Sequence, residues 1–552
     1  MKRIIRGALL CAAIVTAGIV SAQKSKDMSV ARGLNTFSAI VKELEMNYVD
    51  TINSETAFKD AIDAMLQTVD PYTVYYPKED REDISQMTTG EYAGIGAMLL
   101  YKDGGTYVSE PFENSPAYKG GLRAGDRLLK VDTVDVSKFT VDKVSKLLRG
   151  RPDTQVRIRV QRPYVQDSIL NLTVTRAKIR NSSVPYAGVL PDSIGYIRIT
   201  QFIEDTGKDV RAALDTFHAG APGLKGVIID LRGNGGGLLE QAVDVASNFV
   251  PKGTEIVRTI GRDKDATKIY KTMRKPLYPD MPVAVLTDGG TASASEILAG
   301  AMQDLDRGVL VGTRSFGKGL VQTTRPLPYG GVLKVTVAKY YTPSGRLIQS
   351  LDYKHRNPDG SAARVPDSLT HAYKTLHGRT IRDGGGLQPD STVNWKKVNR
   401  LVYNVVSDNW SWDFANKFKA THPTIPTADK FVITDSVYNE FKAFIDPKKF
   451  KYDSAMEEAT EALRKVADEE GYINDETTAA FDSLKKLLTH NLDRDLDTHR
   501  KHIEEYLGGE IVSRYYFDRG RTQYGIRDDE GVDAARGILK DKALYKRILS
   551  GK

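Results

Sequence analysis

Residues 179–395 alternate between apolar strands and amphipathic helices, and no other feature of this 552-residue chain constrains its fold as strongly. The strand-like run KGVIIDL (225–231) is followed by glycines and then by a helical segment at 239–250. PVAVLTDG (282–289) leads in the same way into the helical segment at 293–304. Strands that alternate with helices in this way are typical of α/β domains, so we expect an α/β core here.

The remaining sequence changes character from segment to segment. Residues 23–88 carry apolar side chains at helical spacing, and residues 89–178 form short strand-like runs broken by glycines. Residues 396–552 are polar, charged and helical in pattern. Because the chain is about four times a typical domain length, we expect an α/β multidomain protein. Its expected parts are a helical N-terminal segment, a mostly-β domain, the core at 179–395 and a helical C-terminal extension.

The N-terminus has the pattern of an export signal. Lys2, Arg3 and Arg6 precede an apolar stretch, and small residues end at Ala22. This order is typical of a signal peptide over residues 1–22, cleaved before Gln23. An uncleaved anchor is the alternative, because the apolar stretch is near the lower limit for spanning a bilayer. We therefore expect an exported, periplasmic protein, or a membrane-associated one if the segment is retained.

Composition excludes several classes of function. The chain has one cysteine, Cys11, which rules out a disulfide framework and a multi-cysteine zinc site. Its eight histidines show no H-E-x-x-H pairing, and no pattern indicates a metal or another cofactor. The net charge of +8 is small for this length, so we do not expect nucleic acid as a partner.

The segment 286–322 carries the strongest chemical signal. The predicted strand ends at Asp288, and the small residues TASASE then open a helix. A serine at such a junction exposes its hydroxyl, and neighbouring N–H groups can face a developing oxyanion. The alternative is that Ser295 and Glu296 are ordinary helix-capping residues.

Two further loops favour catalysis. Lys318 lies in SFGKG, where apolar surroundings would lower its pKa enough for it to act as a base. DLRGNGGG (230–237) offers main-chain N–H groups after a strand, although a plain turn is the alternative. The run from Gly312 to Gly319 is close to a phosphate-binding loop, but Gly319 replaces the required Ser or Thr. We therefore reject nucleotide binding.

These segments together resemble the carboxy-terminal processing peptidases, also called tail-specific proteases. The resemblance rests on TASASEILAGAMQD, FGKGLVQ, YYTPSGRLIQ and DLRGNGGG, and it covers roughly residues 30–395. It implies an exported serine endopeptidase with a Ser–Lys dyad, which forms an acyl-enzyme and acts on proteins recognised by their C-terminal tails. Ser293 would be the nucleophile, and Lys318, 25 positions later, would be the general base. Gln322 matches the polar residue that helps to hold the lysine, and Asp304 matches an acidic family position.

The resemblance also places the oxyanion hole. Its donors would be the N–H of Ala294 and a glycine N–H of the 233–237 loop, for which we favour Gly236. The family often has proline where this chain has Gly235, which leaves the glycine donor open. A Ser-His-Asp triad is the competing mechanism, but there is no G-x-S-x-G elbow and no histidine between residues 219 and 354.

Residues 89–178 resemble a PDZ domain. The stretch SPAYKGGLRAGDRLLKVD (115–132) carries the resemblance, and Tyr92–Met98 matches the carboxylate-binding loop. It implies that a peptide with a free C-terminus adds as an extra strand, with Ile95 and Met98 lining the site for its last side chain. Arg149 would report occupancy to the active site. The expected peptide-binding residues are Gly94, Ile95, Gly96, Ala97 and Arg149.

Two functions from different classes follow from these patterns. The first is an active serine endopeptidase, and the second is a PDZ scaffold whose peptidase core has decayed. Because Ser293, Lys318 and Gln322 are all present, the first is favoured. Expected partners are protein or peptide substrates with free C-termini, with an activating adaptor or a homo-oligomer as further options. The helical extension after residue 395 is interpreted as a structural or oligomer-contact domain, with substrate docking as the alternative.

Overall fold

A computed structural model describes residues 28–551, apart from residues 222, 264, 266, 358–361, 396–397 and 452–454. The predicted signal peptide at 1–22 therefore lies outside the described residues. The chain divides into two units, residues 1–76 with 324–335 and residues 77–323 with 336–552. In the described part of the chain, no helix is long and apolar enough to cross a membrane.

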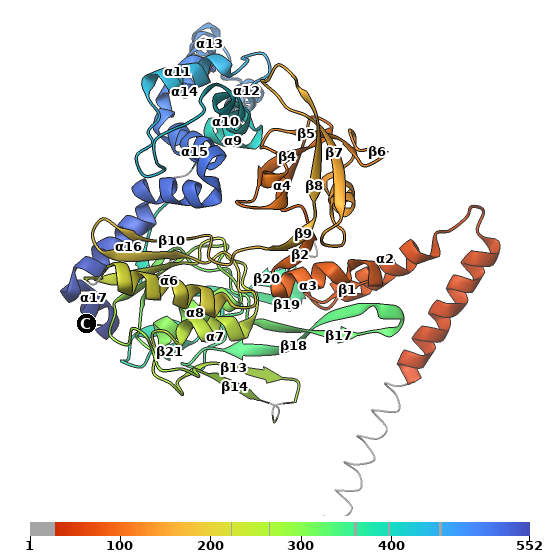
Figure 1. Ribbon diagram of the computed structural model, residues 1–552, viewed down its shortest axis with the longest axis vertical. Coiled ribbons are helices and arrows are strands. Elements are labelled where there is room, and N and C mark those ends of the chain that lie inside the picture. The colour runs from red at the N-terminus through yellow and green to blue at the C-terminus, as the bar shows by residue number, and fades with distance from the viewer. Residues whose placement is uncertain are drawn as a thin grey trace, which may run out of the picture. The chain divides into compact units, whose positions relative to one another are not determined.

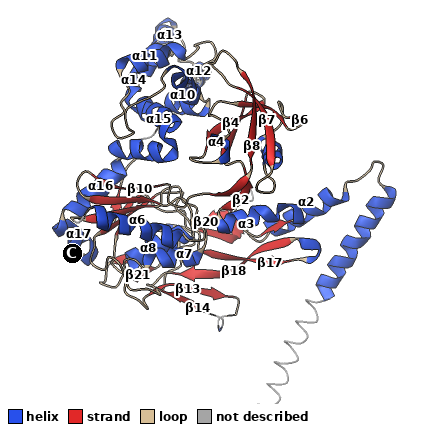
Figure 2. Cartoon of the chain, in the orientation of Figure 1, coloured by secondary structure: helices blue, strands red, loops and turns tan. Residues whose placement is uncertain are grey.

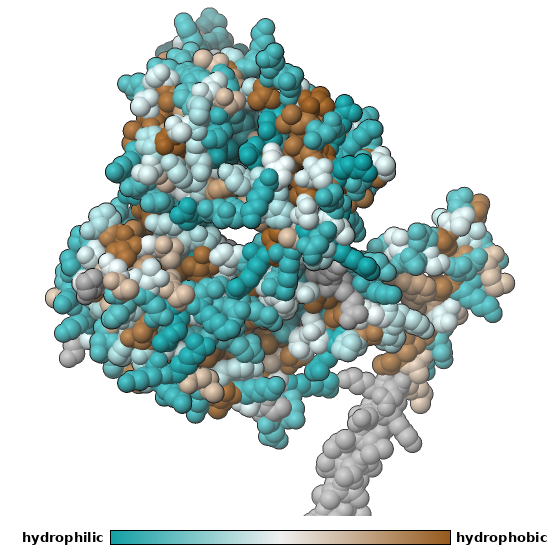
Figure 3. Space-filling view, in the orientation of Figure 1, coloured by the Kyte–Doolittle hydropathy of each residue, from teal (hydrophilic) through white to brown (hydrophobic). Residues whose placement is uncertain are grey.

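The smaller unit begins with the expected helices. A helix over residues 28–47 is followed by α2 (Ser54–Gln67), whose N-terminus is capped by the side chain of Asn53. Strand β1 (Val74–Tyr76) pairs with residues 332–334 of β18 (Val332–Tyr341). Many apolar side chains of this unit, including Leu34 and Phe58, are exposed, and Figure 3 shows apolar patches on its surface.

The mostly-β domain follows helix α3 (Arg81–Thr89) and contains a curved antiparallel sheet. β7 alternates strictly between buried and exposed residues, and the buried residues Val156, Ile158 and Val160 join the core of the domain. Helix α5 adds Val144 and Leu148 to the same core. The elements are β2 (Glu91–Gly94), β3 (Ala97–Lys102), β4 (Gly105–Pro111), α4 (Pro116–Lys119), β5 (Arg127–Val131), β6 (Val134–Asp135), α5 (Val141–Leu148), β7 (Gln155–Gln161), β8 (Ile169–Thr175) and β9 (Ala177–Arg180).

The α/β core is built on a six-stranded sheet of order β10-β11-β12-β15-β16-β23, in which only β10 is antiparallel to its neighbour. Alternate residues of β11, β12, β15 and β16 enter two different apolar clusters, so both faces of the sheet are buried at these strands. One face is covered by α6, α7 and α8 (Figure 2). The elements are β10 (Tyr186–Leu190), β11 (Ile194–Arg198), α6 (Thr206–Gly220), β12 (Gly226–Asp230), α7 (Leu239–Ala246), β15 (Val283–Thr287), α8 (Ala294–Asp304), β16 (Val309–Gly312) and β23 (Ser391–Thr392).

Additional strands extend the core away from this sheet. Residues 338–341 of β18 pair with β13, which also pairs with β14. The segment after Lys318 forms β17, which pairs with β18. Their bounds are β13 (Glu255–Gly261), β14 (Lys268–Lys271), β17 (Leu320–Pro326), β19 (Leu351–Arg356), β20 (Ala362–Arg364), β21 (Ala372–Lys374) and β22 (Thr380–Arg382).

The C-terminal helices go to two different places (Figure 1). Helices α9 to α15 form a separate helical group, in which α9, α10, α11, α14 and α15 pack around Phe414, Phe441 and Ile511. Helices α16 and α17 instead cover the second face of the core sheet, where Val532 and Leu539 pack among the strands. Their bounds are α9 (Arg400–Ser407), α10 (Trp410–Thr421), α11 (Asp435–Phe444), α12 (Ala455–Glu469), α13 (Asp475–Leu488), α14 (Leu492–Thr498), α15 (Arg500–Gly525), α16 (Glu530–Lys540) and α17 (Lys542–Ser550).

Candidate active site

Three loops that the sequence singled out leave neighbouring strands at the same edge of the sheet. The glycine-rich loop follows β12, the serine turn follows β15 and the lysine loop follows β16. These strands are adjacent and parallel, so their carboxyl ends lie side by side. Crevices at the carboxyl ends of parallel strands are where open α/β sheets place their chemistry.

Ser293 lies at a sharp turn between β15 and α8. Its backbone has φ 57° and ψ −118°, a conformation that is costly for a residue with a Cβ atom. All eleven residues of α8 are buried, and within 291–304 only Ser293 reaches solvent. The turn therefore presents a single hydroxyl-bearing residue to the outside of an otherwise buried segment.

The Glu296 carboxylate joins the serine turn to the lysine loop. Its Oε2 accepts the backbone N–H of Ser293 at 2.9 Å and the backbone N–H of Lys318 at 2.8 Å. Its Oε1 accepts the N–H of Gly317 at 2.7 Å and the hydroxyl of Ser315 at 2.5 Å. Burial raises the pKa of Glu296 to about 7, although its four donors act in the opposite direction. The interpretation of Glu296 as a plain capping residue is thus incomplete, because only one of these bonds lies within its own helix turn.

Tyr340 connects the same two residues from the other side. Its buried hydroxyl contacts the backbone carbonyls of both Ser293, at 3.1 Å, and Lys318. Its own N–H donates to the carbonyl of Gly319 at 3.0 Å. Ser293 and Lys318 are therefore fixed to each other through both their N–H and their C=O groups, and the Lys318 side chain is half-buried.

The glycine-rich loop packs directly against the serine turn. A Cβ atom on Gly236 would lie 2.7 Å from Ser293 Cβ and 2.8 Å from the Ala294 nitrogen, so only glycine fits there. Asn234 fastens the loop, because its carbonyl accepts from the Ala292 N–H and from the Ser295 hydroxyl. In this structure the Gly236 N–H donates to Asn234 Oδ1 at 2.8 Å. The N–H that we assigned to the oxyanion hole is thus held in a hydrogen bond within its own loop.

Arg232 anchors the start of this loop to the C-terminal part of the chain. Its guanidinium binds Asp230 at 2.6 Å and Asp529, the N-cap residue of α16, at 2.8 Å. It also stacks over Trp395, 5.4 Å from the ring centroid. Burial opposes ionisation of Asp230, but the charge and hydrogen bonds of Arg232 hold its pKa below the usual value. The loop conformation therefore depends on a residue almost 300 positions further along the chain.

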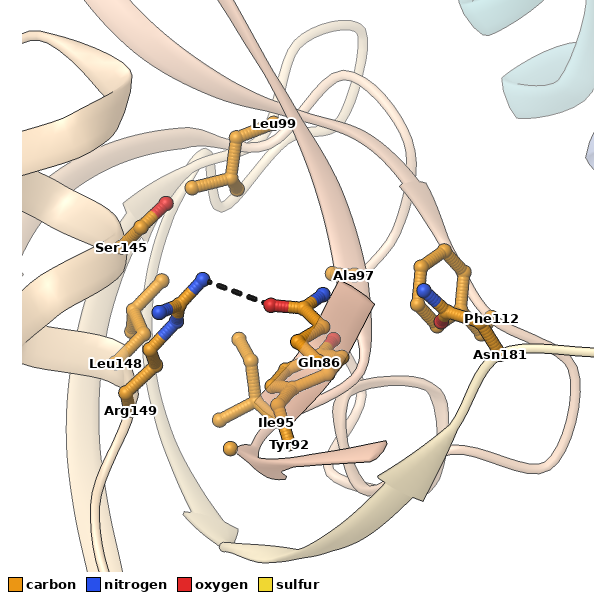
Figure 4. Close-up of a pocket in the computed structure, with 11 residues that line it drawn as sticks. Gln86, Tyr92, Ile95, Ala97, Leu99, Phe112, Ser145, Leu148, Arg149 and Asn181 are labelled. Atoms are coloured by element: carbon orange, nitrogen blue, oxygen red, sulfur yellow. Dashed lines mark hydrogen bonds between the residues drawn. The ribbon is translucent and has the colours of Figure 1, made fainter. Parts of the chain in front are cut away.

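A second candidate site is the groove of the mostly-β domain, shown in Figure 4. It has a volume of about 180 Å³ and lies between β3 on one side and α5 on the other. Its lining includes Gly94, Ile95, Ala97 and Arg149, while Gly96 adopts a positive φ of 75° just beside it. The Arg149 guanidinium donates to Gln86 Oε1 at 3.2 Å.

The side chain of Met98 does not line this groove, contrary to our expectation. Met98 is 55% exposed, and its neighbours Ala97 and Leu99 line the groove instead. Successive side chains of β3 point to opposite faces, so Ala97 and Leu99 share the face opposite to Met98. The apolar lining therefore comes from Ile95, Leu99 and Leu148.

Comparison with known proteins decides the family. Residues 193–359 match the model of peptidase family S41, residues 107–162 match the PDZ domain, and residues 401–539 match the C-terminal helical domain of probable PDZ-proteases. A carboxy-terminal-processing protease of Bartonella bacilliformis is 36% identical over 60% of this chain and 77% of its own length. The carboxy-terminal processing protease CtpA of Bacillus subtilis is 30% identical over 79% of this chain and 92% of its own length.

The chain belongs to the carboxy-terminal processing peptidases. It is therefore a serine-type protease with a PDZ domain. Among solved structures, the photosystem II D1 C-terminal processing protease is similar to it, with 29% identity over 64% of this chain and 86% of that chain and a TM-score of 0.35.

Gln322 and Asp304, which the sequence analysis also singled out, make contacts with residues other than Ser293 and Lys318. Gln322 donates from Nε2 to Thr336 Oγ1 on β18 at 3.1 Å. Asp304, at the far end of α8, makes a buried ion pair of 2.7 Å with Arg346 and accepts the Ser344 N–H. An eleven-residue helix is about 16 Å long, so Asp304 supports the TPSGR segment rather than the serine turn.

Sequence reasoning missed Tyr340, Asn234 and Asp529 as parts of the peptidase site. Tyr340 begins the family-like stretch YYTPSGRLIQ, and Asn234 lies in the glycine-rich loop, so both had a local signal. Asp529 had none. Among the described residues no histidine hydrogen-bonds Ser293, and no group of three or more His, Cys, Asp or Glu side chains could hold a metal ion.

Proposed function

We propose that this peptidase cleaves exported proteins, which it recognises by their C-terminal tails, through a Ser293–Lys318 dyad. The observation that carries the proposal is the Glu296 carboxylate, whose Oε2 accepts the N–H groups of both residues. A nucleophile and its base must keep a fixed separation, and a buried acceptor that binds both backbones helps to maintain it.

The reaction follows from these roles. Neutral Lys318 Nζ takes the proton of the Ser293 hydroxyl while Ser293 Oγ bonds to the scissile carbonyl carbon. The N–H of Ala294 and a glycine N–H of the 233–237 loop stabilise the resulting oxyanion. The C–N bond then breaks, and the lysine ammonium gives its proton to the leaving amine. Water attacks the acyl-enzyme, again with Lys318 as base, and releases the acid and the free serine.

The Gly236 N–H has to leave Asn234 Oδ1, or share its hydrogen, to serve as the glycine donor. The glycine-rich character of the loop supports such a change, since Gly235 has open space around it. To act as the base, Lys318 needs to be largely neutral near the working pH.

The decisive experiment compares the wild type with Ser293→Ala and Lys318→Ala on unfolded casein. Both variants are expected to lose several orders of magnitude in rate while they keep the wild-type circular dichroism spectrum. Lys143→Gln, an exposed lysine of the PDZ domain, is the matched control and retains activity. Near-normal turnover of Lys318→Ala contradicts the dyad, and an inactive wild type that still binds peptides favours the scaffold function.

A further inference from the structure

The PDZ domain and the C-terminal helical group enclose a groove of about 550 Å³ that the proposed reaction does not use. Tyr118, Arg123 and Val165 line it from the PDZ side, and Lys419 and Tyr515 line it from α10 and α15. The two walls are tied together, because Lys102 pairs with Asp413 and Arg521 binds Glu110 at 2.9 Å. Figure 1 shows the helical group beside the strands of the PDZ domain.

Within the described ranges of the chain, two cations of this groove, Arg123 and Lys419, hydrogen-bond only to neutral backbone carbonyls through their side chains. Arg123 Nη1 donates to Tyr118 and Leu122 at 3.0 and 2.8 Å, and Lys419 Nζ donates to Pro423 at 3.0 Å. Arg162 is paired with Asp126, and Arg514 with Glu510, at 2.7 Å and 3.1 Å. Among the residues that the structure describes, Arg123 and Lys419 make no ion pair with a carboxylate. Asn416 at the groove is 7% exposed, and its Nδ2 has no acceptor.

Arg123 and Lys419 also repel each other. Burial lowers the pKa of Lys419, and the charge of Arg123 lowers it further. Arg123 is exposed and Lys419 is half-buried, so the cost of placing these two cations together without a counter-charge falls mainly on Lys419. An anion between them would remove that cost.

Aromatic rings flank both cations. Arg123 stacks on Tyr118 at 4.6 Å from the ring centroid, and Lys419 lies 3.6 Å above the ring of Tyr515. Phe517 meets Tyr118 edge to face at 5.1 Å, at a point where α15 is broken by a φ of 57°. The groove thus offers positive charge next to flat apolar surface, which suits a carboxylate beside an aromatic or aliphatic side chain.

We propose that this groove binds an acidic segment of a polypeptide, with its carboxylates at Arg123 and Lys419 and an adjacent apolar side chain against Tyr118 and Tyr515. This proposal rests on the proposed function in one respect, namely that a protease encounters unfolded polypeptide. The site is separate from the PDZ groove, since the two share no lining residue. Through this second groove, the protease would select substrates by an internal acidic segment in addition to their free C-terminus.

The test is fluorescence anisotropy on the full chain carrying Ser293→Ala, so that no probe is cleaved. The probe is a labelled nonapeptide with four Asp or Glu residues around one Phe, amidated so that it has no terminal carboxylate. Its isosteric Asn/Gln counterpart is expected to bind at least about tenfold more weakly, and added salt is expected to weaken the acidic probe.

Variants assign the binding to the groove. Arg123→Gln with Lys419→Gln is expected to weaken the acidic probe at least about tenfold, while Arg123→Lys with Lys419→Arg retains binding. Lys485→Gln with Lys486→Gln, two exposed lysines of α13, is the matched charge control. Equal affinity for the two probes, or unchanged binding in Arg123→Gln with Lys419→Gln, overturns the proposal. So does a groove-dependent affinity for phosphatidylglycerol vesicles without peptide binding. Casein cleavage by the wild type tests the proposed function separately, and none of these binding results depends on it.

Discussion

The Glu296 carboxylate accepts four hydrogen bonds, and these fill its acceptor positions with donors from both the serine turn and the lysine loop. An ionised carboxylate fits this set, because a proton on either oxygen would replace one acceptor position by a donor. At the scale of single residues, the relative placement of Ser293 and Lys318 thus depends on a side chain that need not touch the substrate.

Glu296→Gln is expected to lower kcat/KM about a hundredfold, mainly through kcat, because an amide cannot accept from all four donors. Steady-state kinetics on a tail peptide measure the change. Glu240→Gln, an exposed glutamate at the start of α7, is the matched control and retains full activity. A KM increase at constant kcat contradicts a positioning role for Glu296.

The pKa of Glu296 links its environment to stability. The folded value of about 7 lies above the ordinary 4.5, so the folded protein holds the proton more tightly than the unfolded chain. This stabilising contribution is complete below pH 4.5 and is lost as the pH rises through 7, with a size on the order of 3 kcal/mol. Differential scanning calorimetry should show the unfolding temperature of the wild type, relative to Glu296→Gln, falling between pH 5 and pH 8. A difference that does not vary with pH refutes the raised pKa.

At the scale of elements, the groove of the PDZ domain lies between a strand and a helix. The PDZ groove needs β3 and α5 together, and Arg149, the residue that ends α5, points into it and contacts Gln86 of α3 (Figure 4). Backbone N–H groups at the start of such a strand can capture a terminal carboxylate while the peptide extends the sheet.

Peptides with an apolar last residue and a free carboxylate should therefore bind the Ser293→Ala protein more tightly than their amides. The expected difference is about 1.5–3 kcal/mol, the range for hydrogen bonds to a charged group. Titration calorimetry with matched acid and amide peptides measures it. Equal affinities would leave tail recognition to the peptidase cleft.

The strand register of β3 supplies a matched pair of variants for the same binding. Leu99→Glu places a charge in the groove and should reduce binding, whereas Met98→Glu changes a side chain that is 55% exposed and should not. If both substitutions act alike, the peptide does not lie along the Leu99 face of β3.

At the scale of the whole molecule, the chain end completes the peptidase core. Helices α16 and α17 cover one face of the central sheet, and the α16 N-cap residue Asp529 binds Arg232 of the glycine-rich loop. Among the described C-terminal residues, Ile526 and the helices α16 and α17 join the packing of the core sheet, whereas α9, α10, α11, α14 and α15 share a separate cluster.

Asp529→Asn separates the two roles of that residue. Asparagine caps a helix about as well as aspartate, so α16 is expected to keep its stability while Arg232 loses a charged partner. We expect kcat/KM to fall about tenfold with little change in unfolding temperature, measured by kinetics and calorimetry. Asp541→Asn makes the same change at the N-cap of α17 and should leave activity intact. An equal loss in both variants would assign the effect to helix capping.

The α/β core, the mostly-β domain, the helical ends and the serine and lysine loops could be predicted from the sequence, because periodicity and glycine placement are local properties. The PDZ domain was predicted from its resemblance to a known family. That the three loops meet could not be predicted from local patterns, since the order β12-β15-β16 arises from pairing between distant segments. Only the tertiary structure gave Glu296 its donors in a loop more than 20 residues away, and Arg232 its partner in Asp529. A local sequence pattern predicts the helix, strand or loop that a segment forms. Contacts between distant segments depend on how their buried surfaces pack together.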